Sequence, residues 1–263
     1  MREAGLDEAI RAVGGVSELA RRLGISQPSV SNWDRIPAER VASVEAATGV
    51  DRARLRPDLF AERAGAQAID ETDAARAQEY ALLATLLRRT PDRDLLARLA
   101  RLKADASPLG LAHAALAEAA AAADAARVGR EFFDLFVGLG RGELLPYGSY
   151  YLTGFLHERP LARLRGDLAD LGIARAEGEV EPEDHVAILC EVMAGLADGR
   201  LGAPEGGDRR AAEKSFFDRH LAPWARRFFV DLERAEAADF YRAVGAVGRT
   251  FIEIETEAFA LPS

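Results

Sequence analysis

Apolar residues recur at helical spacing along most of the chain. From residue 76 onward they follow one another every three or four positions: Tyr80, Leu83 and Leu87; Leu95, Leu99 and Leu102; Leu161, Leu164, Leu168 and Leu171; Phe240, Val244, Val247, Phe251 and Ile254. This period places them on one face of a helix, whereas the two-residue alternation of a half-buried strand is nowhere sustained. The pattern predicts an all-α fold, a small helix-turn-helix domain followed by a larger helical bundle.

Local signals mark where some of these helices begin and end. Thr90-Pro91 and Ser107-Pro108 each offer an N-cap followed by proline at the first helical position. The glycine-rich run 138–142 follows a helical apolar segment and lacks the Gly-Lys-Ser/Thr ending of a phosphate loop. It therefore favours a helix end followed by a turn over a nucleotide cradle, and the question of nucleotide binding stays open.

Charge divides the chain into two parts. The 263 residues carry a formal net charge of −9, but residues 1–60 hold equal numbers of acidic and basic side chains. The whole excess of acid therefore lies in the remainder. Residues 61–75 show no long-period apolar stripe, and we interpret them as a linker or a loosely held helix between a domain at 1–60 and a domain at 76–263.

Several function classes are disfavoured by what the sequence contains. Cys190 is the one cysteine, the N-terminus lacks the apolar core of a secretory signal, and no apolar run reaches the roughly 18 residues that cross a bilayer. We expect a cytoplasmic protein without membrane insertion. The four histidines are dispersed, and the HExxH, CxxC and GxSxG patterns are absent. We therefore expect neither an enzyme nor a metal site.

Residues 16–35 have the pattern of a helix-turn-helix. The motif needs a small residue where two helices cross, a turn residue that tolerates positive φ, and an apolar anchor on the second helix. Ala20, Gly24 and Val30 meet these needs, and Ser26 is placed to cap the second helix. Short polar side chains, which suit base edges in a major groove, occupy its exposed positions. The predicted DNA-binding residues are Gln27, Ser29, Ser31, Asn32 and Arg35.

Residues 5–60 resemble the Cro/YdaS-type helix-turn-helix family. The resemblance extends to the start of the next helix at Ile36-Pro37 and to the closing run Leu55 to Phe60. It implies DNA binding, and flanking arginines such as Arg21 and Arg22 would contact phosphates. A single neutral module binds DNA weakly, so a homodimer or a second DNA contact is expected. The alternative is a helical hairpin that makes protein contacts only.

Three further motifs occur in the larger part. They are Leu145-Pro-Tyr-Gly-Ser-Tyr-Tyr151, Glu181-Pro-Glu-Asp-His185 and His220-Leu-Ala-Pro-Trp224. Pro182 fits the first position of a helix, whose positive end would explain the acids by capping alone. Alternatively, Asp184, Ile188 and Glu191 share a helix face and line a peptide groove with His185. Ordinary core packing is the competing interpretation of the tyrosines and of Trp224.

In this order, the motifs of residues 76–259 resemble the TorD/DmsD/NarJ family of molybdoenzyme maturation chaperones. Membership implies an all-helical cytoplasmic chaperone that binds an immature molybdenum or tungsten oxidoreductase, often through its twin-arginine signal peptide. The client-binding residues implied by motif are Tyr147, Ser149, Tyr151, Asp184, His185, Pro223 and Trp224. Many relatives place an acid where this chain has Gly148.

The resemblance also implies which protein, the chaperone or its client, carries the cofactor. The chaperone holds no stably bound cofactor, and the client would carry a molybdopterin guanine dinucleotide. The motifs are most similar to those of chaperones that accompany formate dehydrogenases, and this similarity is an analogy between families. Our leading hypothesis is therefore a maturation chaperone fused to a DNA-binding module. Its rival is a transcription regulator that uses the helical bundle as a sensor.

Overall fold

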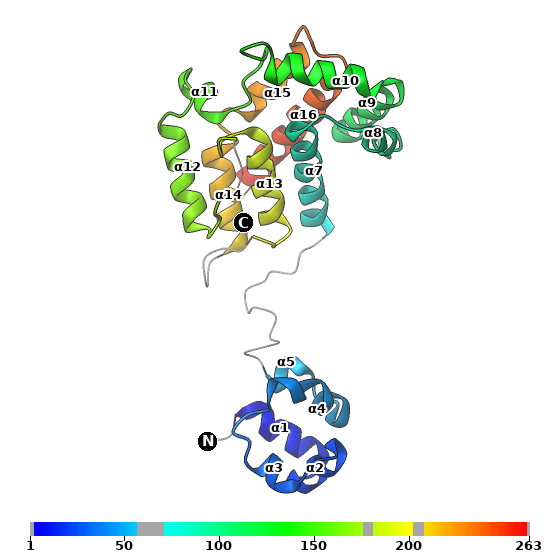
Figure 1. Cartoon of the computed structure of the whole chain (residues 1–263), viewed down its shortest axis with the longest axis vertical. Helices are drawn as coiled ribbons and strands as arrows, with labels where there is room; N and C mark the ends of the chain where they lie inside the picture. The colour runs from blue at the N-terminus through cyan, green and yellow to red at the C-terminus, as the bar shows by residue number, and fades with distance from the viewer. Residues whose placement is uncertain (1–2, 57–70, 176–180, 202–207, 262–263) are drawn as a thin grey trace. The chain divides into compact units, whose positions relative to one another are not determined.

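A computed structural model describes residues 3–56, 71–175, 181–201 and 208–261. Helices dominate these ranges, which contain no strand and one isolated antiparallel bridge between Tyr147 and His185. The all-α prediction is thus confirmed. No helix in the described part of the chain combines the length and the apolar character needed to span a membrane. The chain divides into two compact units, Met1–Ala66 and Gln67–Ser263, which Figure 1 shows with the helix labels used below.

The N-terminal unit contains short helices around a small apolar core. Its elements are α1 (Ala4–Val13), α2 (Val16–Leu23), α3 (Gln27–Ser31), the 3-10 turn η1 (Ala38–Arg40), α4 (Val41–Thr48) and α5 (Arg52–Leu55). Gly24 ends α2 with φ 66°, and Ser26 caps α3 by accepting a hydrogen bond from the Ser29 backbone N–H. Ala20 and Val30 are buried. Each role predicted for the helix-turn-helix residues is met, and of its closing run only Leu55 and Arg56 are described.

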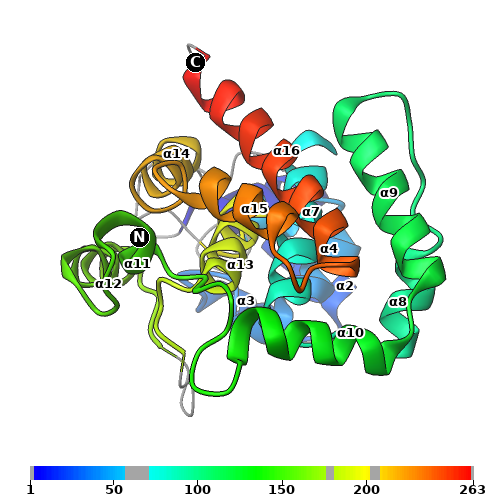
Figure 2. The same ribbon diagram turned by 90° about the horizontal axis from the view of Figure 1, so that it is seen from above.

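The C-terminal unit is a larger helical bundle. Its elements are α7 (Glu71–Arg88), α8 (Arg93–Leu99), α9 (Pro108–Ala122), α10 (Ala125–Phe132), the π-turn η2 (Phe133–Val137), α11 (Gly148–Thr153), α12 (Arg159–Asp170), α13 (Val186–Ala197), α14 (Arg209–His220), α15 (Ala225–Arg234) and α16 (Phe240–Ala260). Helices α12, α14, α13 and α7 lie side by side in Figure 1. Helix α16 packs on α15 and on α9 (Figure 2).

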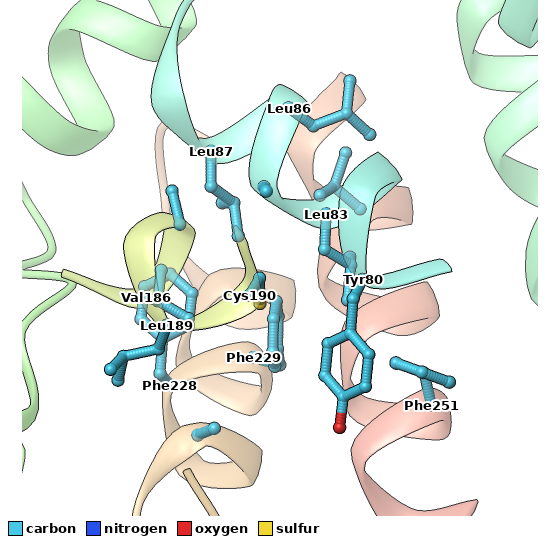
Figure 3. Packing of buried hydrophobic residues seen from close by; sticks show 14 of the residues in the cluster. Tyr80, Leu83, Leu86, Leu87, Val186, Leu189, Cys190, Phe228, Phe229 and Phe251 are labelled. Carbon is cyan, nitrogen blue, oxygen red and sulfur yellow. The ribbon is translucent and has the colours of Figure 1, made fainter. Parts of the chain in front are cut away.

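The core of this unit joins α7, α13, α15 and α16. Figure 3 shows Tyr80 of α7 beside Phe251 of α16; the ring centroids are 4.7 Å apart and the planes cross at 74°. Helix α7, which carries the leucines of the predicted stripe, packs on α13 and also contacts α16. Edge-to-face aromatic pairs of this kind stabilise a core beyond the apolar area that they bury. The helical stripes of the sequence therefore do form the core.

Helix ends were predicted with mixed success. Ser107 caps α9 ahead of Pro108, as predicted. Thr90 does not cap a helix, because α8 begins later and Asp92 accepts the hydrogen bond from the Leu95 backbone N–H. Gly138 ends η2 with φ 64°, which agrees with a helix terminator in the glycine-rich run.

The segment interpreted as a linker or a loosely held helix is helical at its C-terminal end. Residues 71–75 form the first turn of α7, and the earlier part of the segment lies outside the described residues. Asp73 explains the helical start, since its carboxylate accepts hydrogen bonds from Arg76 Nη1 at 3.0 Å and from Arg209 Nη2 at 2.6 Å. The apolar stripe misses this turn because polar contacts hold it to the bundle.

A buried ionic cluster lies one turn further along α7. Arg76 donates to Glu255 on α16, from Nε to Oε1 at 2.7 Å and from Nη2 to Oε2 at 2.5 Å, and it also donates to Glu213 on α14. Tyr80 donates its hydroxyl to Glu255 at 2.9 Å. The stripe on α16 consequently continues at Glu255, which is 1% exposed, whereas Ile254, predicted in the core, is 39% exposed.

Candidate functional site

Two motifs far apart in the sequence meet at an antiparallel bridge. Residue 147, ahead of α11, pairs with residue 185, ahead of α13. The flanking backbone hydrogen bonds run from Gly148 N to Asp184 O at 2.9 Å and from Val186 N to Pro146 O at 2.8 Å. The Tyr147 and His185 rings contact edge to face, with centroids 5.2 Å apart. The bridge thus brings the starts of two helices together.

Asp184 lies beneath this bridge and supports α11. Its Oδ2 accepts a hydrogen bond of 2.7 Å from the Ser149 backbone N–H in the first turn of that helix. Asp184 is 3% exposed and Ser149 is fully buried. Within the described ranges, Asp184 Oδ1 and Ser149 Oγ have no hydrogen-bond partner. A buried carboxylate oxygen without a donor is costly, so it calls for a donor from elsewhere.

His185 is itself the cap of α13, which corrects the sequence prediction. Its Nδ1 accepts a hydrogen bond of 3.1 Å from the Ala187 backbone N–H, and the helix begins at Val186 rather than at Pro182. The bridge explains the late start, since it holds this segment extended. Imidazole replaces the usual oxygen acceptor at the helix N-terminus.

Tyr147 and Tyr151 are half-buried and anchored through their hydroxyls. Tyr147 donates to Glu181 Oε2 at 2.6 Å, and Tyr151 donates to Asp231 Oδ2 at 3.1 Å. Burial, reinforced by the neighbouring carboxylate, raises the pKa of each phenol well above its usual value. Both phenols therefore stay protonated and act as hydrogen-bond donors.

Trp224 joins this aromatic group from the segment before α15. It stacks on Tyr151 with centroids 5.4 Å apart and planes inclined by 30°, and its indole N–H donates to the His220 carbonyl at 2.6 Å. Trp224 is 2% exposed, so packing accounts for most of its surface. Pro223 beside it is exposed. The core-packing interpretation therefore describes Trp224 better than it describes the tyrosines.

A cavity of about 520 Å³ opens between α11, α12 and α14. Its apolar wall comprises Leu152, Pro160, Leu164, Leu189 and Trp224. Its polar groups are Asp184, Asp167, His220, Arg163 and Arg219. Of the predicted client-binding residues, Asp184 and Trp224 line the cavity, and the other five do not. This size and mixed lining are typical of ligand pockets.

Gly148 also lines this cavity and explains how closely Trp224 approaches α11. A Cβ at position 148 would lie 3.0 Å from Trp224 Nε1 and 3.2 Å from Cε2. A larger side chain would require the indole to shift. The departure from relatives that carry an acid here thus leaves Asp184 and Asp167 as the carboxylates lining the cavity.

Asp167, His220 and Arg219 form a polar cluster in the wall that sequence reasoning missed as a site. Asp167 Oδ2 lies 2.7 Å from His220 Nε2, and Oδ1 accepts from Arg219 Nη1 at 3.0 Å. Burial lowers the pKa of His220 despite the carboxylate, so the neutral imidazole donates through Nε2. Burial acts to raise the pKa of Asp167, but the hydrogen bonds from His220 and Arg219 outweigh burial and lower this pKa. The motif His220 to Trp224 was the one available signal.

The predicted groove shared by Asp184, Ile188 and Glu191 does not form. Ile188 and Glu191 line a second cavity of about 350 Å³ together with Glu183, and Asp184 is not among its lining residues. The bridge holds Asp184 in the extended segment before α13, so Asp184 does not share a helix face with Ile188 and Glu191. Asp184 instead lines the 520 Å³ cavity, whose other walls come from α12 and α14.

The predicted DNA-binding residues cluster on and just after α3. Gln27, Ser29, Asn32 and Arg35 are exposed and Ser31 is partly buried. Ser29 Oγ lies 2.7 Å from Ser26 Oγ, and Gln27 Nε2 donates to Ser31 Oγ at 3.2 Å. The polar face thus exists as predicted, with some of its hydrogen-bonding groups satisfied within the helix.

Two families match the chain. The nitrate reductase delta subunit family matches residues 102–230, and the bacterial toxin YdaS family matches residues 6–64. Both resemblances that the motifs indicated are confirmed.

Individual relatives agree with the first match. The chaperone protein TorD of Aliivibrio fischeri is 28% identical over 135 residues, which are 49% of this chain and 63% of that protein. The Tat proofreading chaperone DmsD of Haemophilus influenzae is 30% identical over 112 residues, 42% of this chain and 51% of the relative. The chain thus spans less than two thirds of the length of the relatives it matches. A redox enzyme maturation protein from Archaeoglobus fulgidus is similar in structure, with 20% identity, a TM-score of 0.45, and coverage of 68% of this chain and 93% of that one.

Proposed function

We propose that the larger unit of this chain, which is similar to the TorD/DmsD/NarJ family of redox-enzyme maturation chaperones, holds an apo molybdenum or tungsten oxidoreductase before cofactor insertion. The client segment would bind in the cavity between α11, α12 and α14. Five apolar residues line this cavity, and they suit a peptide that is exposed only while the client is unfolded. The molybdopterin guanine dinucleotide would belong to the client.

One observation carries this proposal: the bridged motifs place a buried, half-satisfied carboxylate at an apolar cavity. Asp184 uses Oδ2 to hold α11, and its Oδ1 has no donor in the described structure. A basic side chain of the client would supply that donor, and charge-assisted hydrogen bonds are the stronger kind. Tyr147, Ser149, Tyr151 and His185 then act as positioning residues for Asp184 and α11. We also propose the cytoplasm as the compartment and formate dehydrogenase as the first client to test.

The test is co-purification of the full chain with an apo-oxidoreductase, followed by assay of the molybdenum content of the client. We expect association with the unloaded client and a higher metal content when the chain is present. Asp184→Asn should lower recovery of the client at least about tenfold. Asp218→Asn, which removes an exposed acid on α14 that pairs with Lys214, is the matched control. Absence of both association and a difference in metal content would refute the proposal.

A second function is favoured by the N-terminal unit. Its α2 and α3 pack as a helix-turn-helix, and the YdaS family matches this region. We propose that this unit binds DNA through Gln27, Ser29, Ser31, Asn32 and Arg35, as a homodimer, and that client binding changes operator affinity. The rival, a regulator that has lost chaperone activity, predicts the same DNA sites without client association.

Genome-wide recovery of crosslinked DNA tests this second function. We expect discrete sites that disappear in a Gln27→Ala, Ser29→Ala variant, and recovery of no discrete site would refute DNA binding. Titrating the operator with and without saturating apo-client then tests coupling. Equal operator affinities in the two titrations would refute coupling, because a client that does not distinguish the two states cannot shift their populations.

A further inference from the structure

The charged groups around the cavity do not all have partners. Asp167 is bound by Arg219 and by His220, so these three satisfy one another. Two charged residues of the cavity lining, Asp184 and Arg163, are outside this cluster. Asp184 is 3% exposed and its Oδ1 lacks a donor, whereas Arg163 is exposed on α12 and forms no ion pair with the described residues. The cavity therefore has an unsatisfied negative charge in its wall and an unsatisfied positive charge at its rim.

This arrangement favours a particular pattern of charge in the bound segment. A guanidinium or ammonium group that enters the cavity would donate to Asp184, and its aliphatic stem would lie along Leu152, Leu164 and Trp224. The neighbouring client residue would then lie near Arg163. A second base at that position would be repelled, whereas an acid would be attracted.

We propose that the cavity selects a client segment in which one basic side chain has an acidic one within a turn of it, and that Arg163 is the specificity-determining residue. This inference rests on the proposed function and narrows its partner. It disfavours a pair of adjacent arginines, and therefore points to a client segment outside a twin-arginine signal.

The experiment measures binding of fluorescent 12-residue peptides to the full chain by anisotropy. All peptides share an apolar background with one fixed arginine, and they differ in one residue, Glu, Gln or Arg, placed one to four positions before or after it. We expect the best Glu peptide to bind about three- to tenfold more tightly than its Arg counterpart, a preference typical of one exposed charge pair. A peptide with citrulline in place of the fixed arginine should bind at least about tenfold more weakly.

Variants assign the preference to its residue. Arg163→Glu should reverse the order of the Glu and Arg peptides, and Arg163→Gln should remove the difference. Arg159→Glu is the matched control, because Arg159 is exposed on the same helix but does not line the cavity; it should leave the order unchanged. Asp184→Asn should make the arginine and citrulline peptides equal.

The inference is overturned if Arg peptides bind as tightly as Glu peptides, or if no peptide binds more tightly than the citrulline control. It is also overturned if Arg163→Glu and Arg159→Glu have the same effect on the order of peptide affinities. Because Arg163 is exposed, its replacement is not expected to unfold the bundle, which circular dichroism checks. Co-purification with an apo-oxidoreductase distinguishes failure of the charge preference from failure of the proposed chaperone function. If the client associates while the peptide order is unaffected by Arg163, the charge preference alone is wrong; loss of association in the wild-type chain refutes the proposed function itself.

Discussion

The two units of this chain differ in whether they contain a buried arginine ion pair among the described residues. In the N-terminal unit the ion pairs of the described residues lie at the surface, for example Arg21 with Glu18 at 2.6 Å and Arg52 with Glu45 at 2.6 Å. In the C-terminal unit Arg76 is 8% exposed and binds two carboxylates, of Glu213 and Glu255, that are 0% and 1% exposed.

The comparison separates what holds each unit together. Solvent screens an exposed ion pair, so removing one partner costs little. A buried cluster differs, because removing one member leaves the other charges without compensation in a poorly solvated interior. Burial raises the pKa of Glu213 despite the attraction of Arg76, which indicates how strongly that carboxylate depends on its partner. The small unit should thus depend on its apolar core, and the large unit on its buried cluster as well.

The largest effect is expected for Arg76→Ala. The variant leaves Glu213 and Glu255 buried without their shared donor, so we expect the free energy of unfolding of the C-terminal unit to fall by about 3–5 kcal/mol. Hydrogen exchange of the full chain, followed on peptides from each unit, measures this loss and should show no change in residues 3–56.

Arg249→Ala is the control for that variant. Arg249 pairs with Glu233 at 2.6 Å while 31% of its side chain is exposed, so its loss should cost about 0.5 kcal/mol. Equal losses for the two variants would contradict the contrast between buried and exposed pairs.

The next effect is expected for Leu19→Ala in the N-terminal unit. Leu19 is fully buried, and large-to-small substitutions at such sites cost about 2–5 kcal/mol. Because a unit of this size has little stability to spare, we expect residues 3–56 to exchange with solvent as an unfolded segment. Leu111→Ala on α9, where the leucine is 62% exposed, is the control and should change little. Protection of the N-terminal unit that survives Leu19→Ala would contradict its dependence on this core.

Sequence reasoning succeeded where the determinants are local. The helix-turn-helix follows from residues within one or two turns of each other, such as Ser26 capping α3 and Gly24 ending α2. Helical stripes likewise located the core positions Tyr80, Val244 and Phe251.

It failed where tertiary contacts overrule the local pattern. The bridge from Tyr147 to His185 delays the start of α13 and removes Asp184 from its helical face. Arg76 makes Glu255 a core residue in place of Ile254. Asp167 could not be assigned to the cavity, because its contact with His220 joins residues 53 positions apart. The family resemblance supplied the site motifs, and the fold determined which of them reach the cavity.

A smaller effect is expected from the titration of His220. Burial lowers its pKa in the folded chain, so its contribution to stability is complete above the unfolded value near 6.5 and is lost as pH falls through the folded value. We therefore expect acid destabilisation of the C-terminal unit below pH 6.5 to be weaker in His220→Gln than in the wild type, relative to each protein at pH 8. Thermal unfolding between pH 5 and 8 measures this difference. Parallel profiles would show that His220 is not linked to folding.

The smallest effect on stability, and the sharpest test of the surface pairs, is expected for Glu18→Gln. Hydrogen bonds from Arg21 and Arg22 lower the pKa of Glu18 to about 2, so it is ionised in any practical assay and neutralises both arginines. The substitution should leave the unfolding midpoint unchanged, since all three groups lie at the surface. It should nevertheless strengthen DNA binding and make the slope of log affinity against log salt more negative by about 1–2, because two phosphate contacts become available. Glu39→Gln is the control, because it makes the same change of net charge at an exposed acid of the same unit that forms no ion pair within the described residues. If both variants change the slope equally, the general charge of the unit determines affinity; if neither does, this face does not contact DNA.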